Sequence, residues 1–391
     1  MATENNNKTL NVPNLRFPEF RGEWEKFRND SLFNVVSEKN KGKQITSVLS
    51  ASQTDGMVSR DSLGIDIKFE EDSIKNYKIV HEGDYVIHLR SFQGGFAFSD
   101  RVGVCSPAYT ILRPTQQISY GFLKPFFMSN KFIDSLRLVT YGIRDGKSIS
   151  VEEWLKLNTN LPSVEEQKKI SIFLSLLDDR IATQIKIIEK LESLIRGISN
   201  NLLYSESGTP VRLGDILSER SERTKVNNQH EVLSSTVKGI FSQREYFSKD
   251  IASENNVGYK VIRLHDVVLS PQNLWMGNIN YNDKFDIGIV SPSYKIFSIA
   301  DGYDKRFVAA MLKTHRALNN YMLVSEQGAS VVRRNLNMEA FEQLVFKMPP
   351  IDKQREIGNA ISALQSRLEL AVRAKTAYEK QKQWLLTQMF I

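Results

Sequence analysis

Residues 161–204 read LPSVEEQKKISIFLSLLDDRIATQIKIIEKLESLIRGISNNLLY, and residues 348–391 read MPPIDKQREIGNAISALQSRLELAVRAKTAYEKQKQWLLTQMFI. The two stretches align without a gap at an offset of 187 residues. In each, a hydrophobic-Pro step is followed by a glutamine, Gln167 or Gln354, and then by a long helical pattern. This arrangement, present twice in one chain, indicates an internal duplication.

The helical pattern after Gln167 carries a heptad seam. Apolar residues recur at alternating spacings of four and three, with one polar position, which is typical of a coiled coil. At about 1.5 Å per residue this helix is a rod of roughly 60 Å, too long to bury its apolar stripe inside one small domain. It therefore needs a partner helix. The seam positions are Ile170, Leu174, Leu177, Ile181, Gln184, Ile188, Leu191 and Ile195.

The second long helix is the expected partner of the first. Lys375 and Lys382 interrupt its seam farther along, although the aliphatic parts of their side chains can still pack. Since the two seams are equal in length, we expect pairing within the chain; the alternative is that each helix forms half of an intermolecular coiled coil. The seam begins with Ile357, Ile361, Leu364 and Leu368.

The repeat extends upstream of both helices. KIVHEGDYVI at 78–87 matches KVIRLHDVVL at 260–269, and Ser-Pro-Ala-Tyr at 106–109 matches Ser-Pro-Ser-Tyr at 291–294. These β-branched runs predict strands, and a helical pattern follows them in each half. We therefore predict an α+β fold with two duplicated mixed α/β domains separated by two long helices. The predicted segments are a first domain at 1–160, with 1–12 disordered, a helix at 161–204, a second domain at 205–347 and a helix at 348–391.

Composition excludes several classes of protein. Of the 391 residues, 41% are hydrophobic and 25% are charged, which suits a globular protein rather than a disordered one. No apolar stretch is long enough to cross a membrane, and the N-terminus lacks the apolar core of a secretory signal, so we expect a cytoplasmic protein. The net charge of +7 permits a polyanionic partner without requiring one. Cys105 and five scattered histidines provide no zinc site.

Motifs for catalysis are incomplete. Gly146-Lys147-Ser148 resembles the end of a phosphate-binding loop, but Tyr141 stands where that loop needs glycine. The clustered carboxylates of magnesium-dependent nucleases and the Asn/Asp-Pro-Pro-aromatic motif of amino-methyltransferases do not occur in the sequence. We therefore expect no catalytic residue, no metal site and no cofactor bound by this chain. Two alternatives stay open: a stand-alone DNA methyltransferase or nuclease, and a coiled-coil scaffold that does not bind DNA.

Three segments carry a family resemblance: the opening VPNLRFPEFRGEWEKF (12–27) and the paired steps LPSVEEQKKI (161–170) and MPPIDKQREI (348–357). With the long helix after each step, they resemble the specificity subunit of a type I restriction–modification system over essentially the whole chain. The resemblance implies two target-recognition domains that read the halves of a gapped double-stranded DNA sequence, with an antiparallel coiled coil setting the gap. It also implies docking of two adenine-N6 methyltransferase subunits and of translocase–nuclease subunits, to which S-adenosylmethionine, ATP and magnesium belong. The second step departs from the family pattern, with Asp352-Lys353-Gln354 where Glu-Gln is usual.

Basic and amide side chains are the candidates for DNA contact, because they neutralise phosphates and read guanine and adenine edges in the major groove. They lie in matching places of the two halves, in loops after strands and before the Pro steps; each alone also fits a solvated surface charge. RSFQGGF (90–96) differs from PQNLWMG (271–277), so we expect the halves to read different sequences. The candidates are Lys41, Lys43, Arg60, Arg90, Gln93, Arg144, Lys147, Arg220, Arg223, Lys225, Gln272, Asn273, Arg333 and Arg334.

Overall fold

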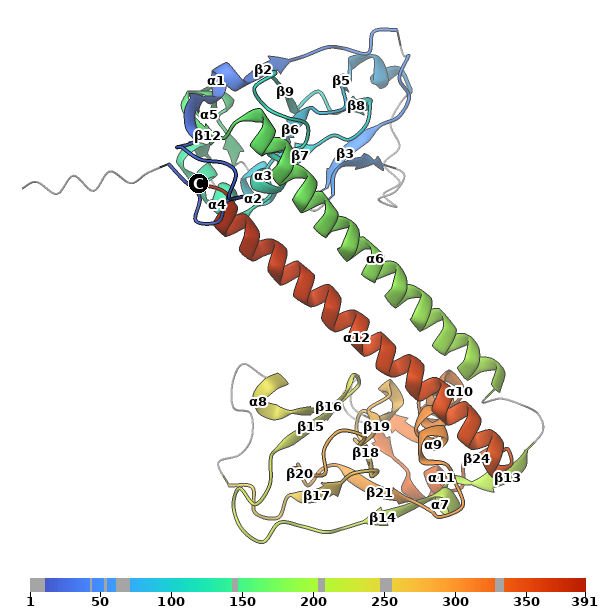
Figure 1. Cartoon of the computed structure of the whole chain (residues 1–391). Coiled ribbons are helices and arrows are strands. Elements are labelled where there is room, and N and C mark those ends of the chain that lie inside the picture. Colours follow the sequence, from blue (N-terminus) through green and yellow to red (C-terminus); the bar gives the residue numbers. More distant parts are fainter. Residues whose placement is uncertain are drawn as a thin grey trace, which may run out of the picture. The chain divides into compact units, whose positions relative to one another are not determined.

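The computed structural model divides the chain into two compact units, and each is described by itself. Unit 1 comprises Met1–Gln184 and Ala374–Ile391, and unit 2 comprises Ile185–Arg373. Two long helices, α6 (Val164–Leu202) and α12 (Ile351–Met389), are unbroken ribbons in Figure 1, and each belongs in part to both units. The structure describes residues 11–42, 44–52, 55–60, 71–142, 147–202, 208–246, 255–327 and 334–391.

Unit 1 is built on an antiparallel sheet of four strands in the order β2-β9-β6-β7. These strands are β2 (Phe33–Val36), β9 (Thr110–Pro114), β6 (Tyr85–Ile87) and β7 (Ala97–Phe98). The two-stranded pairs are β1 (Glu25–Arg28) with β12 (Asn158–Leu161), β3 (Leu49–Ser52) with β4 (Gly56–Ser59), β5 (Lys78–Val80) with β8 (Gly103–Cys105), and β10 (Thr140–Tyr141) with β11 (Ser148–Ile149). The short helices are α1 (Asn29–Leu32), η2 (Glu71–Asn76), α2 (Ser91–Gly94), α3 (Lys124–Phe127), α4 (Asn130–Ser135), η3 (Leu136–Val139) and α5 (Val151–Lys156).

Unit 2 contains an antiparallel sheet of four strands in the order β14-β21-β18-β19. These strands are β14 (Leu217–Arg220), β21 (Lys295–Ile299), β18 (Val267–Leu269) and β19 (Ile279–Tyr281). The two-stranded pairs are β13 (Thr209–Arg212) with β24 (Val345–Met348), β15 (Leu233–Thr236) with β16 (Gly239–Ser242), β17 (Lys260–Arg263) with β20 (Ile287–Val290), and β22 (Ser325–Gln327) with β23 (Arg334–Leu336). The helices are α7 (Leu213–Ile216), α8 (Gln243–Tyr246), η5 (Leu274–Met276), α9 (Lys305–Leu312), α10 (His315–Leu323) and α11 (Met338–Glu342).

The same succession of paired strands therefore occurs in both units. Each sheet of unit 1 has a counterpart in unit 2 with the same strand order, and individual contacts repeat as well. Lys78 donates from Nζ to the carbonyl oxygen of Tyr109 at 2.6 Å, and Lys260 donates to that of Tyr294 at the same distance. Two stretches of sequence with different loops thus fold by the same strand pairing.

One inner strand of each four-stranded sheet, β6 in unit 1 and β18 in unit 2, is covered on both faces and is called the central strand. In β6 the alternating residues Tyr85 and Val86 belong to different core clusters, and in β18 the same is true of Val267 and Val268. Successive side chains of a strand point to opposite faces, so a strand buried on both faces must be apolar at every position. This explains the uninterrupted apolar runs at 85–87 and 267–269.

Within unit 1 the beginning of α6 packs against the end of α12. Ile170, Leu174 and Leu177 share one core cluster with Leu385 and Met389. Lys382 forms an ion pair with Asp178, and the guanidinium of Arg180 lies 6.0 Å from the ring centre of Tyr378. As residue numbers rise along α6 they fall along α12, so the two segments run antiparallel in this unit.

Within unit 2 the remaining parts of the two helices share the other large core cluster, which holds Ile198 of α6 together with Ile357 and Ile361 of α12. None of the described helices is long and apolar enough to cross a membrane. The seam positions of both helices are all buried or half-buried, whereas most of the residues between them are exposed. Lys375 and Lys382 are half-buried too, so the seam continues through them by way of their side-chain stems.

The glutamine of each Pro step ties the long helix to its unit. Gln167 accepts a hydrogen bond at Oε1 from the backbone N–H of Ser119 (2.8 Å) and donates from Nε2 to the carbonyl oxygen of Pro162 (3.0 Å). Gln354 repeats both contacts, accepting from Asp304 (3.0 Å) and donating to the carbonyl oxygen of Pro349 (2.8 Å). Both glutamines are buried. The recurring Pro–Gln spacing is thus a clamp that satisfies buried backbone groups.

A buried ion pair explains why the second Pro step departs from the first. Arg16 donates from Nε and Nη2 to the two carboxylate oxygens of Glu166, at 2.8 and 2.7 Å, and the Glu166 side chain is only 1% exposed. The position equivalent to Glu166 in α12 is Lys353, which is exposed and pairs with Glu356. The segment that carries Arg16 precedes β1 in unit 1, so Glu166 has a partner that Lys353 does not need.

Candidate nucleic-acid interface

In each unit, the loop that follows the central strand lies beside a two-stranded hairpin. In unit 1, α2 follows β6 and packs against β11. In unit 2, η5 follows β18, and the backbone N–H of Arg334 in β23 donates to the carbonyl oxygen of Gln272 at 3.2 Å. Both places carry polar side chains that the sequence marks as DNA-binding candidates. We call α2 together with the β10–β11 hairpin the unit 1 reading edge, and η5 together with the β22–β23 hairpin the unit 2 reading edge.

At the unit 1 reading edge, Arg90 precedes the first residue of α2 and Gln93 lies within it, and both side chains are exposed. Lys147 is exposed directly before β11. These three candidates therefore come from segments that the fold brings into contact. His88 lies beside this edge, and its Nδ1 accepts a hydrogen bond from the backbone N–H of Arg90 at 3.3 Å. Burial lowers the pKa of His88 to about 4, so the ring is neutral near pH 7.

The other candidates of unit 1 lie elsewhere. Lys41 is exposed in the segment between β2 and β3. Arg60 follows β4 and is half-buried, with its Nε donating to Ser50 Oγ at 3.3 Å. Lys43 and Arg144 fall outside the described residues.

The unit 2 reading edge gathers Gln272, Asn273 and Arg334. Gln272 is exposed, and the other two are half-buried. The guanidinium carbon of Arg334 lies 4.8 Å from the ring centre of Trp275, within the range of a cation–π contact. Arg333 lies outside the described residues. Tertiary contact thus joins three of the candidates and adds Trp275, which the sequence analysis does not single out.

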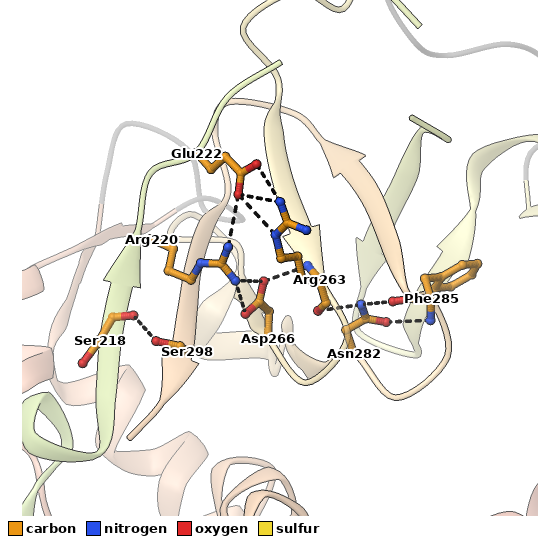
Figure 2. Close-up of polar contacts among 8 residues, drawn as sticks. All are labelled: Ser218, Arg220, Glu222, Arg263, Asp266, Asn282, Phe285 and Ser298. Atoms are coloured by element: carbon orange, nitrogen blue, oxygen red, sulfur yellow. Dashed lines mark hydrogen bonds and ion pairs between the residues drawn. The ribbon is translucent and has the colours of Figure 1, made fainter. Parts of the chain in front are cut away.

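Arg220 occupies a charge network inside unit 2, shown in Figure 2. Its Nη1 donates to both carboxylate oxygens of Asp266, at 2.9 and 3.0 Å, and its Nη2 donates to Glu222 at 3.2 Å. Arg263 binds the same Glu222, which lowers the pKa of that carboxyl group mainly through this hydrogen bond. Burial raises the pKa of Asp266, against the hydrogen bond from the backbone N–H of Arg263 and the charge of Arg220. The charge of Arg220 is therefore compensated within the unit.

Unit 1 contains a related network. Asp84 accepts hydrogen bonds from Nε and Nη2 of Arg113, both at 3.0 Å, and from the backbone N–H of His81 at 2.9 Å. His81 lies 3.2 Å from Glu38. The arginine comes from β9 here and from β14 in unit 2. The buried aspartate keeps the same place in both units, directly before β6 in unit 1 and directly before β18 in unit 2. Since an aspartate braced in this way recurs in both units, we assign the networks to the turn before the central strand.

Arg223 and Lys225 are the remaining candidates of unit 2. Both are exposed; Arg223 donates from Nη1 to the carbonyl oxygen of Gly258 at 2.9 Å, and the backbone N–H of Lys225 donates to Gln229. Both residues precede β15 in the chain, whereas the elements of the unit 2 reading edge come later in the sequence.

Sequence reasoning did not find a polar network that braces the β15–β16 hairpin. Asn280 of β19 donates from Nδ2 to Ser235 Oγ and to the carbonyl oxygen of Thr236, both at 2.7 Å. Lys313, exposed as a whole residue, donates from Nζ to Asn280 Oδ1 at 2.5 Å and to the carbonyl oxygen of Val237 at 3.3 Å. Burial of its ammonium group lowers the pKa of Lys313 to about 8. No local sequence pattern signals the network, because its members come from separate strands and a helix end.

The described residues contain no group of three or more histidine, cysteine, aspartate or glutamate side chains placed to hold a metal ion. Cys105 is buried in β8, and burial raises the pKa of its thiol to about 12. A thiol in that state is protonated near neutral pH and is a poor nucleophile.

Comparison with known proteins finds a matching family model and several similar solved structures. Residues 21–193 match the family model of the type I restriction modification DNA specificity domain. Among solved structures, the type I restriction-modification S subunit from M. genitalium is similar with a TM-score of 0.61 and 14% sequence identity, covering 97% of this chain and 99% of that chain. The HsdS subunit from Thermoanaerobacter tengcongensis follows with a TM-score of 0.44 and 14% identity, covering 94% and 96%.

A third solved structure, described in terms of the complex assembly and conformational transition of the type I R-M system, has a TM-score of 0.48 and 14% identity and covers 94% and 97%. None of the curated proteins matches the sequence. The match at residues 21–193 runs from the segment before β1, through the strands and short helices of unit 1, into α6. Residues 21–193 thus resemble a type I restriction modification DNA specificity domain, and over nearly its whole length the chain has the fold of a solved type I S subunit.

Proposed function

We propose that this chain is the DNA sequence-specificity subunit of a type I restriction–modification complex and reads a bipartite, gapped target, one half-site per unit. The observation that carries the proposal is the repetition of one strand pairing in two units whose reading edges differ in sequence. A shared scaffold with unlike loops suits a target of two unlike halves. The match of residues 21–193 to the family model of the DNA specificity domain supports the same role.

Each reading edge supplies side chains of the kinds that recognise bases. At the unit 1 edge these are Arg90, Gln93 and Lys147, and at the unit 2 edge Gln272, Asn273 and Arg334. Arginine and lysine recognise guanine O6 and N7 in the major groove, and glutamine and asparagine recognise adenine N6 and N7. Exposed basic residues beyond the edges, such as Lys41 and Arg223, are suited to phosphate contact, which positions the protein without reading sequence.

The two long helices act in this proposal as the spacer that fixes the gap between the half-sites. Their seam positions are buried or half-buried along both helices, and the contacts within unit 1 are those of antiparallel neighbours. An antiparallel pair of helices resists bending more than a single helix does. The length of the pair therefore determines which gap in the DNA fits.

Partner subunits supply the chemistry. We propose that two adenine-N6 methyltransferase subunits and translocase–nuclease subunits dock on this chain and bring S-adenosylmethionine, ATP and magnesium with them, and that this chain is not itself catalytic. A surface suited to docking lies on α6 in unit 1, where Ile172 and Leu176 are 61% and 57% exposed beside Phe173. Adjacent exposed apolar residues on one helix face are typical of a protein–protein contact.

Co-expression with an adenine-N6 methyltransferase subunit, followed by genome-wide mapping of modified adenines, tests the proposal. We expect methylation at one gapped motif with two unlike halves. The purified chain alone should neither methylate nor cleave DNA. Methylation by the chain alone would identify a stand-alone enzyme, and a complex that does not bind DNA in a salt-dependent way would identify a scaffold.

A further inference from the structure

Arg334 differs from Arg220 and Arg263, two other arginines of unit 2, in how its charge is met. Arg220 and Arg263 are paired with Asp266 and Glu222. Among the residues the structure describes, Arg334 forms no ion pair; its guanidinium lies over Trp275 at 4.8 Å, and its buried Nε has no hydrogen-bond partner. An arginine that is half-buried without a carboxylate keeps its full charge for a ligand.

The support beneath Arg334 is rigid. Leu274 is fully buried, and the turn around it is closed by backbone hydrogen bonds from Asn273 to Ser270 (3.1 Å) and from Gly277 to Leu274 (2.8 Å). Gly277 has a φ of 93°, a left-handed conformation that glycine adopts without strain. The backbone N–H of Arg334 is in turn bonded to Gln272 at 3.2 Å. Both the ring and the arginine backbone are therefore fixed to one loop.

We propose that Trp275 positions Arg334 as the guanine-reading residue of the second half-site, an inference that rests on the proposed function. A guanidinium lying on an aromatic ring is fixed in orientation, so its terminal N–H groups lose little freedom when they bind. Two parallel N–H donors match the O6 and N7 acceptors that guanine alone presents side by side in the major groove. Trp275 is a positioning residue here, because it acts on the DNA through Arg334.

The unit 1 reading edge lacks this pair. Its loop reads RSFQGGF (90–96) where unit 2 reads PQNLWMG (271–277), and β11 holds Ser148 and Ile149 where β23 begins with Arg334. The inference therefore applies to one half-site only, which gives the experiment an internal reference.

The test uses the full chain in complex with its methyltransferase partner, in the variants Arg334→Lys, Arg334→Ala and Trp275→Leu. Wild type first defines the gapped motif by mapping of modified adenines. For Arg334→Ala we expect one G·C position in one half-site to become degenerate, with the other half-site and the gap unchanged. Binding to the wild-type site should weaken about 5- to 150-fold, the range for loss of one bidentate base contact. Trp275→Leu should relax the same position to a smaller extent.

Arg373→Ala is the matched control, because Arg373 is an exposed arginine of unit 2 that pairs with Glu369 on α12; the motif should not change. Thermal melting of each variant shows whether it is folded. The inference is overturned if Arg334→Ala keeps the complete motif. It is also overturned if Arg334→Ala weakens binding to all sequences equally, Arg334→Lys restores it, and the salt slope of Arg334→Ala falls by about one, which marks a phosphate contact. A wild-type complex without any gapped motif would instead refute the proposed function, and this inference with it.

Discussion

Duplicating one heptad in each long helix should widen the gap between the half-sites. The contacts Lys382–Asp178 and Arg180–Tyr378 set the register of α6 and α12 in unit 1. Extended along both helices, this register places residues 185–191 opposite 368–374. Copying each of these segments directly after itself keeps the alternating spacing of four and three, so the seam positions stay in phase. Both helices grow by the same length, and neither pairing slips.

The size of the effect follows from helix and DNA geometry. Seven residues at about 1.5 Å each add about 10.5 Å to the spacer, and DNA rises about 3.4 Å per base pair along its axis. We therefore expect the gap to lengthen by about three base pairs, while both half-site sequences stay the same. Three base pairs also turn the second half-site by roughly 100° about the DNA axis at about 10.5 base pairs per turn. Because this rotation turns the second half-site away from the unit that reads it, methylation should be slower than with wild type.

The assay is mapping of modified adenines in cells that express the altered chain with its methyltransferase partner. Duplication in α6 alone serves as the control, because it leaves the partner helix too short and should lower stability instead of creating a new motif. An unchanged gap in the doubly lengthened chain, with methylation still present, would refute the spacer role of the helices. A changed half-site sequence would show that the insertion had disturbed a reading edge.

Three further predictions concern the supports of the fold. Arg16→Ala should reduce the free energy of unfolding by about 3–5 kcal/mol in urea denaturation, because it leaves the buried Glu166 carboxylate unpaired; an effect below about 1 kcal/mol would mean that Glu166 finds water. Gln354→Ala should lower the free energy of unfolding by about 1–3 kcal/mol for each backbone group that it leaves without a hydrogen-bond partner. The variant Lys353→Ala, at an exposed neighbouring residue, should change it by no more than about 0.5 kcal/mol. The pKa of His88 is lowered to about 4, below its ordinary value of about 6.5, so the unfolded chain takes up the proton first and stability falls as the pH drops from about 6.5 to 4. His88→Asn should flatten that part of the stability–pH curve, and an unaltered slope would contradict the burial of a neutral ring.

The long helices show what sequence periodicity can predict. The expected ranges 161–204 and 348–391 enclose the observed helices Val164–Leu202 and Ile351–Met389. The seams were readable because the positions that face a partner repeat every seven residues regardless of what the partner is. The division of the chain was less predictable. Parts of both helices belong to each compact unit, although the helices look like separate segments in the sequence.

The candidate DNA contacts show the limit of sequence reasoning. Arg220 and Arg334 occupy places that the sequence treats alike, yet one is held by carboxylates and the other lies on an aromatic ring. Asp266 is 46 residues from Arg220, and Trp275 is well separated from Arg334 in the chain. A charge is compensated or available according to which distant segments pack beside it, and no local pattern encodes that.

The amino-acid sequence by itself indicated the repeat, the two heptad seams and the paired Pro–Gln spacing, because each of these follows from residue spacing within one element or from repetition along the chain. Tertiary structure alone decided which polar side chains gather at a reading edge, since strands and hairpins far apart in sequence meet there. It also decided which buried charges are neutralised, as Arg16 and Glu166 are, because an ion pair needs two side chains within a few ångströms and sequence distance does not fix spatial distance.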